Sequence, residues 1–151
     1  NNQIRSVNFK PAQAPEFTIN KITPNDQNFK LIGLPENNQL KAGVDINELA
    51  GGLKKFSIES ASTKTTEDNP IVLSVTYELF SGLKYILIVS KQDEQYFMVI
   101  NLENADSSSD FNQQLENWRF LIPSYKFDAL NKNLMDLIEP IPNPQSTATT
   151  E

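Results

Sequence analysis

The segment 71–102 constrains the fold most, because apolar and polar residues alternate along it in three successive runs. Such alternation is typical of half-buried β-strands, whose successive side chains point to opposite faces of a sheet. Tight turns are predicted between the runs, at Ser81-Gly82 and at Lys91–Glu94. The segment therefore predicts a three-stranded antiparallel meander, with one face formed by Ile71, Leu73, Val75, Tyr77, Leu79, Leu83, Tyr85, Leu87, Val89, Tyr96, Met98, Ile100 and Leu102.

The opposite face of this meander carries apolar residues as well. They are Ile86, Ile88, Phe97 and Val99. Strands that are apolar on both faces are usually covered on both, or pack against another domain or protein. We therefore interpret these four residues as a binding surface for a partner protein.

Shorter alternating runs precede the meander. Ile4–Lys10 is predicted as an edge strand that ends at Pro11, because proline cannot donate a hydrogen bond to a sheet. Glu16–Ile22 and Phe29–Leu34 are predicted as the two strands of a hairpin, with a turn at Thr23–Asp26.

Two helices are predicted. The first begins after Asp45, a suitable N-cap with Glu48 three residues later, and Gly51-Gly52 either ends it early or allows close packing on the sheet. The second follows a strand at Trp118–Ile122, begins with Ser124 as its N-cap and stops at Glu139-Pro140. Its apolar face is expected to contain Phe127, Leu130, Leu134, Leu137 and Ile138.

These elements indicate the α+β class: an antiparallel β-sheet, made of the meander and the N-terminal hairpin, with two main helices packed on it. Residues 1–15 are interpreted as a polar N-terminal segment that contains the edge strand, residues 16–140 as a single α+β domain, and residues 141–151 as a disordered tail. Because Asn1 is not an initiator methionine and no signal-type apolar segment follows it, we expect the chain to be part of a longer protein.

Charge and composition argue against several classes of function. The net charge is −6, and the basic residues are dispersed, which disfavours binding to nucleic acid or to an anionic membrane surface. No apolar run approaches the roughly 20 residues that span a bilayer, so direct membrane insertion is not expected. The sequence contains no histidine and no cysteine, so the usual base of nucleophilic catalysis and the commonest zinc ligands are missing. We expect no catalytic residue, no cofactor and no metal.

Paired carboxylates are the one catalytic device that this composition leaves open. Glu67-Asp68, Asp93-Glu94 and the pair Asp106 and Asp110 all lie in predicted polar loops, where their charges are solvated. A carboxylate-based hydrolase is therefore the weakest of three hypotheses. Calcium binding at 106–117 is not expected, because an EF-hand loop needs a central glycine and a closing glutamate, and this loop has Phe111 and Asn117 at those positions.

Aromatic side chains near the strand-to-helix junction support a second hypothesis. Trp118 and Tyr125 stand on either side of Pro123. A cleft between the last helix and the sheet near these two residues would suit a small ligand or a glycan. Arg119 is expected to alternate outward as a solvated strand residue.

The ordered motifs of the chain also resemble a known family. SVTYELFSGLKYILIVSKQDEQYFMVIN and LENWRFLIPSYKFDALNKNLMDLIEP, together with three motifs between residues 4 and 61, resemble the bacterial domain of unknown function 4340 family in the same order over residues 4–140. Ser81 replaces the aspartate of the family's turn. The resemblance implies a membrane-anchored, extracytoplasmic (periplasmic) protein associated with gliding-motility-type ABC transporters, tethered by a membrane helix absent from this chain. It implies other envelope or membrane-complex proteins as partners, and no catalytic residue.

Overall fold

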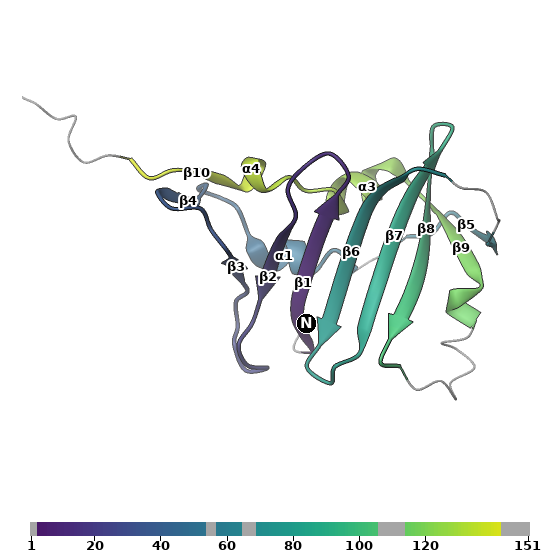
Figure 1. Ribbon diagram of the computed structural model, residues 1–151, viewed down its shortest axis with the longest axis horizontal. Helices are drawn as coiled ribbons and strands as arrows, with labels where there is room; N and C mark the ends of the chain where they lie inside the picture. Colours follow the sequence, from purple (N-terminus) through teal and green to yellow (C-terminus); the bar gives the residue numbers. More distant parts are fainter. Residues whose placement is uncertain (1–2, 54–56, 65–68, 106–113, 143–151) are drawn as a thin grey trace, which may run out of the picture.

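The computed structural model describes residues 3–53, 57–64, 69–105 and 114–142. An eight-stranded antiparallel sheet dominates it, in the order β3-β2-β1-β6-β7-β8-β9-β5 (Figure 1). Its strands are β1 (Ile4–Pro11), β2 (Phe17–Asn20), β3 (Lys30–Ile32), β5 (Ser60–Thr63), β6 (Ile71–Leu79), β7 (Lys84–Gln92), β8 (Gln95–Glu103) and β9 (Trp118–Ile122). The short strands β4 (Asn38–Leu40) and β10 (Ile138–Pro140) form a second, two-stranded sheet.

The predicted meander is confirmed as β6, β7 and β8. Tyr77 pairs with Tyr85 and Val89 with Met98, so the alternating apolar positions from Leu73 onward share one face. Ile71 does not belong to it, because the register shifts between Ile71 and Leu73 and leaves Ile71 57% exposed. Leu87, Val89 and Met98 on that face are buried. The turn between β6 and β7 is wider than the predicted two residues: the Leu79 N–H donates to the Leu83 carbonyl. Gly82 occupies its left-handed position, with φ 88°.

The N-terminal strand is an interior strand of the sheet, so its prediction as an edge strand is wrong. β1 pairs with β2 on one side and with β6 on the other. Val7 and Phe9 are 0% and 1% exposed, which is the burial of a central strand. The polar, proline-containing surroundings of this strand in the sequence do not reveal that β6, more than sixty residues later, lies beside it. The predicted hairpin of β2 and β3 is confirmed.

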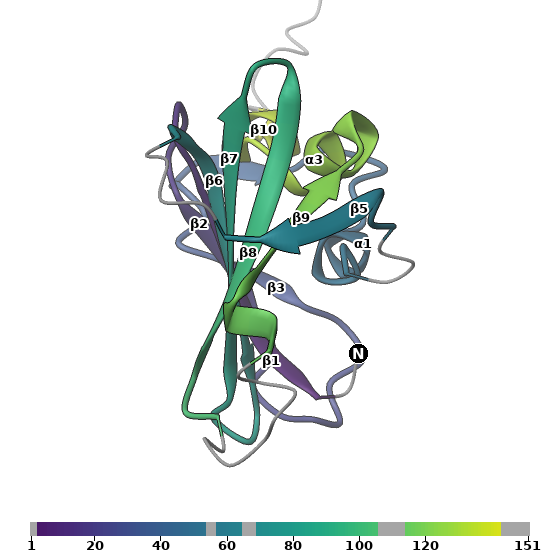
Figure 2. The same cartoon turned by 90° about the vertical axis from the view of Figure 1, so that its right-hand side faces the viewer.

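Helices cover one face of the sheet (Figures 1 and 2). They are α1 (Ile46–Ala50), α3 (Ser124–Leu130) and α4 (Leu134–Leu137). Only α3 reaches seven residues, so the expectation of two main helices is wrong and the described part of the chain is mostly β. None of the helices in these ranges has the length and apolar composition that crossing a membrane requires.

Residues that start or end helices explain why α1, α3 and α4 are short. Asp45 caps α1 as predicted, by accepting from the Asn47 N–H, and Gly51 ends the helix one turn later. The predicted last helix breaks at Asn131–Asn133, where the Asn133 side chain accepts from the Met135 N–H and starts α4 afresh. Asparagine competes with helical hydrogen bonding in this way, which favours caps over helix interiors. Pro123, not Ser124, is the N-cap of α3.

Beyond this break the chain forms a strand that the helical pattern hides. Ile138, expected on the helix face, begins β10 and pairs with Leu40 of β4. The Lys41 N–H donates to the Leu137 carbonyl at 2.9 Å, and the Ile141 N–H donates to the Asn37 carbonyl at 2.8 Å. Backbone hydrogen bonds to residues 37–41 therefore hold residues 137–141 in place.

The core contains one close contact that explains Gly52. A Cβ at this position would lie 2.8 Å from Leu130 Cδ2 and 3.2 Å from the Tyr77 hydroxyl, so a larger side chain would displace buried atoms. Both proposed roles of the glycine pair apply: Gly51 ends α1, and Gly52 permits close packing on the sheet. The Tyr77 hydroxyl is buried and has no hydrogen-bond partner among the described residues. Burial raises its pKa well above the usual value.

Candidate functional site

Apolar side chains form a continuous stripe on the sheet face opposite the helices. Ile88 pairs with Val99, while Ile86 and Phe97 lie two residues away from them along β7 and β8. Leu121 of β9 pairs with Phe97 and extends the group. We call these five half-buried residues, Ile86, Ile88, Phe97, Val99 and Leu121, the outer-face stripe. The structure therefore brings the four predicted residues together and adds Leu121, which outward alternation within the predicted strand 118–122 could have identified.

The stripe covers only half of its face. On the β1–β2 side the same face is polar: the Asn8 amide donates to the Thr18 hydroxyl at 2.9 Å, and Ser6 donates to Glu78 at 3.3 Å. Figure 2 places α1 and α3 on the other side of β6, β7 and β8. None of the partly buried residues that pack against the core belongs to the stripe. An apolar patch bounded by a polar surface is characteristic of a protein-binding surface.

Arg119 borders the stripe and is more than a solvated strand residue. Its guanidinium lies 4.3 Å from the centre of the Phe97 ring. It donates to the Ser62 hydroxyl at 3.2 Å and to the Gln92 side-chain oxygen at 3.3 Å. These contacts span β5, β9, β8 and β7, so Arg119 adds a fixed positive charge to an otherwise apolar patch.

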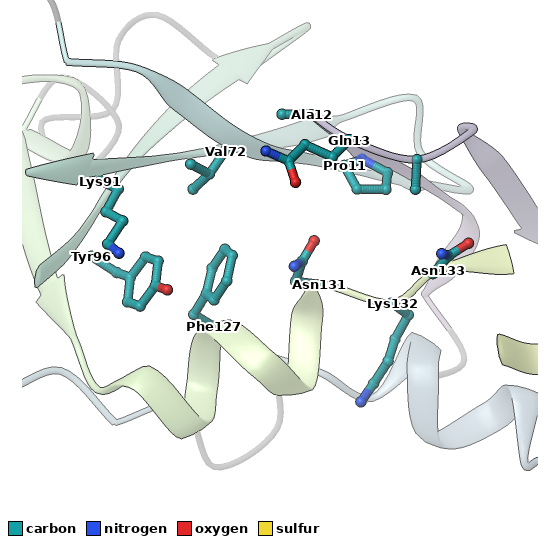
Figure 3. A pocket seen from close by; sticks show the side chains of 11 residues that line it. Pro11, Ala12, Gln13, Val72, Lys91, Tyr96, Phe127, Asn131, Lys132 and Asn133 are labelled. Atoms are coloured by element: carbon teal, nitrogen blue, oxygen red, sulfur yellow. The ribbon is translucent and has the colours of Figure 1, made fainter. Parts of the chain in front are cut away.

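A hollow of about 480 Å³ lies on the helix side, between the end of α3 and the sheet. Pro11–Ala14 and Val72 line one wall, and Phe127 and Asn131–Asn133 line the other. Figure 3 shows the amides of Gln13 and Asn131 facing each other across it, while the Lys132 side chain extends away. The size is within the ordinary range of small-molecule sites. Gln13 and Asn131 carry no local sequence signal, because only tertiary packing brings them together.

Aromatic rings close one end of this hollow. Tyr96 and Phe127 stack with their ring centres 4.0 Å apart and their planes at 9°. Lys91 lies 5.8 Å from the Tyr96 ring and is paired with Glu94 at 3.1 Å. The hydrogen bond and the charge of Glu94 raise the pKa of Lys91. A ligand would thus meet amide groups, a ring pair and a cation.

Trp118 and Tyr125 do not line this hollow. Trp118 is 39% exposed and borders a separate hollow of about 240 Å³ with Ala61, Gln114, Leu115 and Phe120. Tyr125 is 59% exposed on α3, and its hydroxyl donates to the Ser57 hydroxyl at 3.3 Å. A cleft between the last helix and the sheet exists, but Tyr96 and Phe127 supply its aromatic rings.

The carboxylates considered for catalysis do not form a cluster among the described residues. Glu67, Asp68, Asp106 and Asp110 lie outside the described residues, as does most of the loop considered for calcium. Asp93 and Glu94 occupy the turn between β7 and β8, and the Glu94 side chain is 93% exposed. Within the ranges that the structure describes, no three acidic side chains gather as a metal site would require.

Comparison of the chain with protein-family models, with curated proteins and with solved structures finds no match. The resemblance to the domain of unknown function 4340 family therefore rests on the quoted motifs alone.

Proposed function

We propose that this chain is a non-catalytic, protein-binding module of a membrane-anchored protein of the bacterial cell envelope. The observation that carries the proposal is the outer-face stripe, a continuous apolar patch beside a polar half-face. The extracytoplasmic location and the membrane-complex partners rest on the family resemblance. Arg119 at the border of the stripe suits a partner surface that combines apolar groups with an acceptor.

A matched pair of substitutions tests this function. Val99→Asp introduces a charge into the stripe, and Asn20→Asp introduces the same charge on the polar half of the same face. We expect Val99→Asp to weaken capture of the partner at least about tenfold, because desolvating a charge in an apolar interface costs more than 1.4 kcal/mol. Asn20→Asp should leave capture unchanged.

The measurement is quantitative affinity capture from detergent-solubilised envelope membranes, with the full-length protein as bait. Thermal unfolding of both variants controls for loss of fold. Capture of the same proteins by Val99→Asp as by the unmodified protein would refute the stripe as the binding surface. Capture of none by any form would refute the proposed function.

A second candidate function is binding of a small polar ligand in the 480 Å³ hollow, favoured by its facing amides and stacked rings. A thermal-shift screen of mono- and disaccharides tests it, since a ligand at a hundredfold excess over Kd stabilises by about 2.7 kcal/mol. Gln13→Ala should then weaken binding about threefold to tenfold, the value of one lost hydrogen bond. Gln27→Ala, exposed elsewhere, is the control. Equal affinity of both variants would rule the hollow out.

A further inference from the structure

The strand β5 is an open edge of the large sheet. It pairs only with β9, at one end of the strand order, and Figure 1 shows it at the right-hand end of the sheet. All four of its residues, Ser60–Thr63, are exposed. Such an edge presents unpaired backbone groups that can pair with another chain.

The register identifies these groups. The Lys64 N–H donates to the Asn117 carbonyl at 3.0 Å. In an antiparallel pair, hydrogen-bonded residues alternate along the strand, so Ser62 also turns its backbone groups toward β9. By the same alternation, the N–H and C=O groups of Ala61 and Thr63 point away from β9, toward the open edge of the sheet.

An apolar hollow lies beside this edge. Ala61 pairs with Phe120 and Thr63 with Trp118, so the side chains of these four residues share one sheet face. On that face Ala61, Leu115, Trp118 and Phe120, together with Gln114, line the hollow of about 240 Å³. Trp118 is 39% exposed there, which is a large apolar surface at a sheet edge.

The two sheet edges differ in how they are protected. β3, at the other end, has only three residues and includes Lys30, and short, charged edge strands discourage pairing. β5 contains no charged residue and no proline, and its pairing with β9 is regular from Ser60 to Thr63, although the Glu59 N–H also donates to the Leu121 carbonyl opposite Ser60. It therefore lacks the lysine that protects β3.

We propose that β5 is a strand-addition site for an extended segment of a partner protein, in which large apolar and polar residues alternate. The segment pairs with the outward backbone groups of Ala61 and Thr63, and one of its apolar side chains enters the hollow beside Trp118. Backbone pairing supplies affinity and the side-chain hollow supplies specificity, as in other strand-addition complexes. This site does not depend on the outer-face stripe.

The hollow also indicates which occupant fits. A second copy of the chain that paired through its own β5 would bring only serine, alanine and threonine side chains to the edge. These are too small to fill a cavity of about 240 Å³ beside a partly exposed tryptophan. A partner segment with a leucine, isoleucine or phenylalanine at the facing position would fill it.

The test uses a fluorescent peptide of alternating threonine and leucine with lysines at both ends, at physiological salt. We expect it to bind the protein and to protect the Ala61 and Thr63 amides from hydrogen exchange. Ala61→Pro removes an outward N–H that β9 does not use, and Ala61→Leu fills the hollow from within. Each should weaken binding at least about tenfold, whereas Ser60→Leu, on the opposite face, should change it less than about threefold.

A peptide N-methylated at the amides that face β5 is the control for backbone pairing, and it should bind at least about tenfold more weakly. Thermal unfolding verifies that the variants fold, and Ala61→Leu carries the test if Ala61→Pro does not. No binding of the unmodified peptide, or equal binding by the N-methylated peptide, would overturn the proposal. A dimer of the protein that Ala61→Pro dissociates would replace the partner segment with a second copy.

Discussion

Replacing Leu87 with alanine is expected to lower the free energy of unfolding by about 2–5 kcal/mol, the range for a buried leucine truncated in a packed core. Leu87 is 1% exposed and belongs to the single hydrophobic core between the sheet and the helices. The loss combines the removed apolar contacts with the cavity left behind. Urea denaturation monitored by tryptophan fluorescence measures it, because Trp118 is the only tryptophan.

Ile88→Ala, one residue further along the same strand, is the matched control. Its side chain lies half-buried on the outer face, so we expect a loss of about 1 kcal/mol. Similar losses for Leu87→Ala and Ile88→Ala would contradict the assignment of the two faces. Such a result would also mean that the outer-face stripe is covered in solution, which would remove the basis of the proposed function.

Replacing Tyr77 with phenylalanine is expected to stabilise the protein and to remove part of its sensitivity to alkali. The buried hydroxyl has no partner among the described residues, so its loss should raise the free energy of unfolding by about 1 kcal/mol at neutral pH. Burial raises the pKa of Tyr77 above its ordinary value of 10.0. Above that pH the unfolded tyrosine ionises while the folded one keeps its proton, so stability falls as pH rises, by about 1.4 kcal/mol per pH unit.

Urea denaturation at several pH values between neutrality and strong alkali measures this effect. The variant should show a shallower fall with pH than the unmodified protein. Tyr125→Phe is the control, because this tyrosine is 59% exposed and should leave the slope unchanged. Parallel slopes for Tyr77→Phe and the unmodified protein would contradict the burial of the hydroxyl. A loss of stability at neutral pH would show that the hydroxyl has a hydrogen-bond partner.

Local patterns predicted those parts of the fold that depend on neighbouring residues. Alternation placed the meander strands and their two faces, and the N-cap Asp45 placed the start of α1. The prediction of one continuous last helix was wrong at Asn131–Asn133. The apolar spacing continues through this segment and predicts a helix, but in the structure the capping tendency of asparagine ends α3 and starts α4. Cap chemistry at Asn133 was therefore the signal that could have predicted the break.

The candidate sites divide in the same way. Ile86, Ile88, Phe97 and Val99 could be grouped from sequence because all four lie in one meander, whose tight turns set the register. The hollow between Gln13 and Asn131 could not, because these residues are more than one hundred positions apart and lie outside regular strands. The open edge at β5 could not either, since it depends on where the strand order ends.

Local sequence patterns were sufficient to predict three strands in 71–102, apolar on both faces, and the composition leaves the chain without histidine and cysteine side chains. The position of β1 inside the sheet, the covering of one apolar face by helices and the place of β5 at the end of the strand order became known from the three-dimensional fold. The two kinds of feature differ in the sequence separation of the residues that determine them. A period of two residues is a local property of the backbone, whereas strand order and the choice of covered face follow from contacts between segments far apart in the chain, whose free energies no local pattern records.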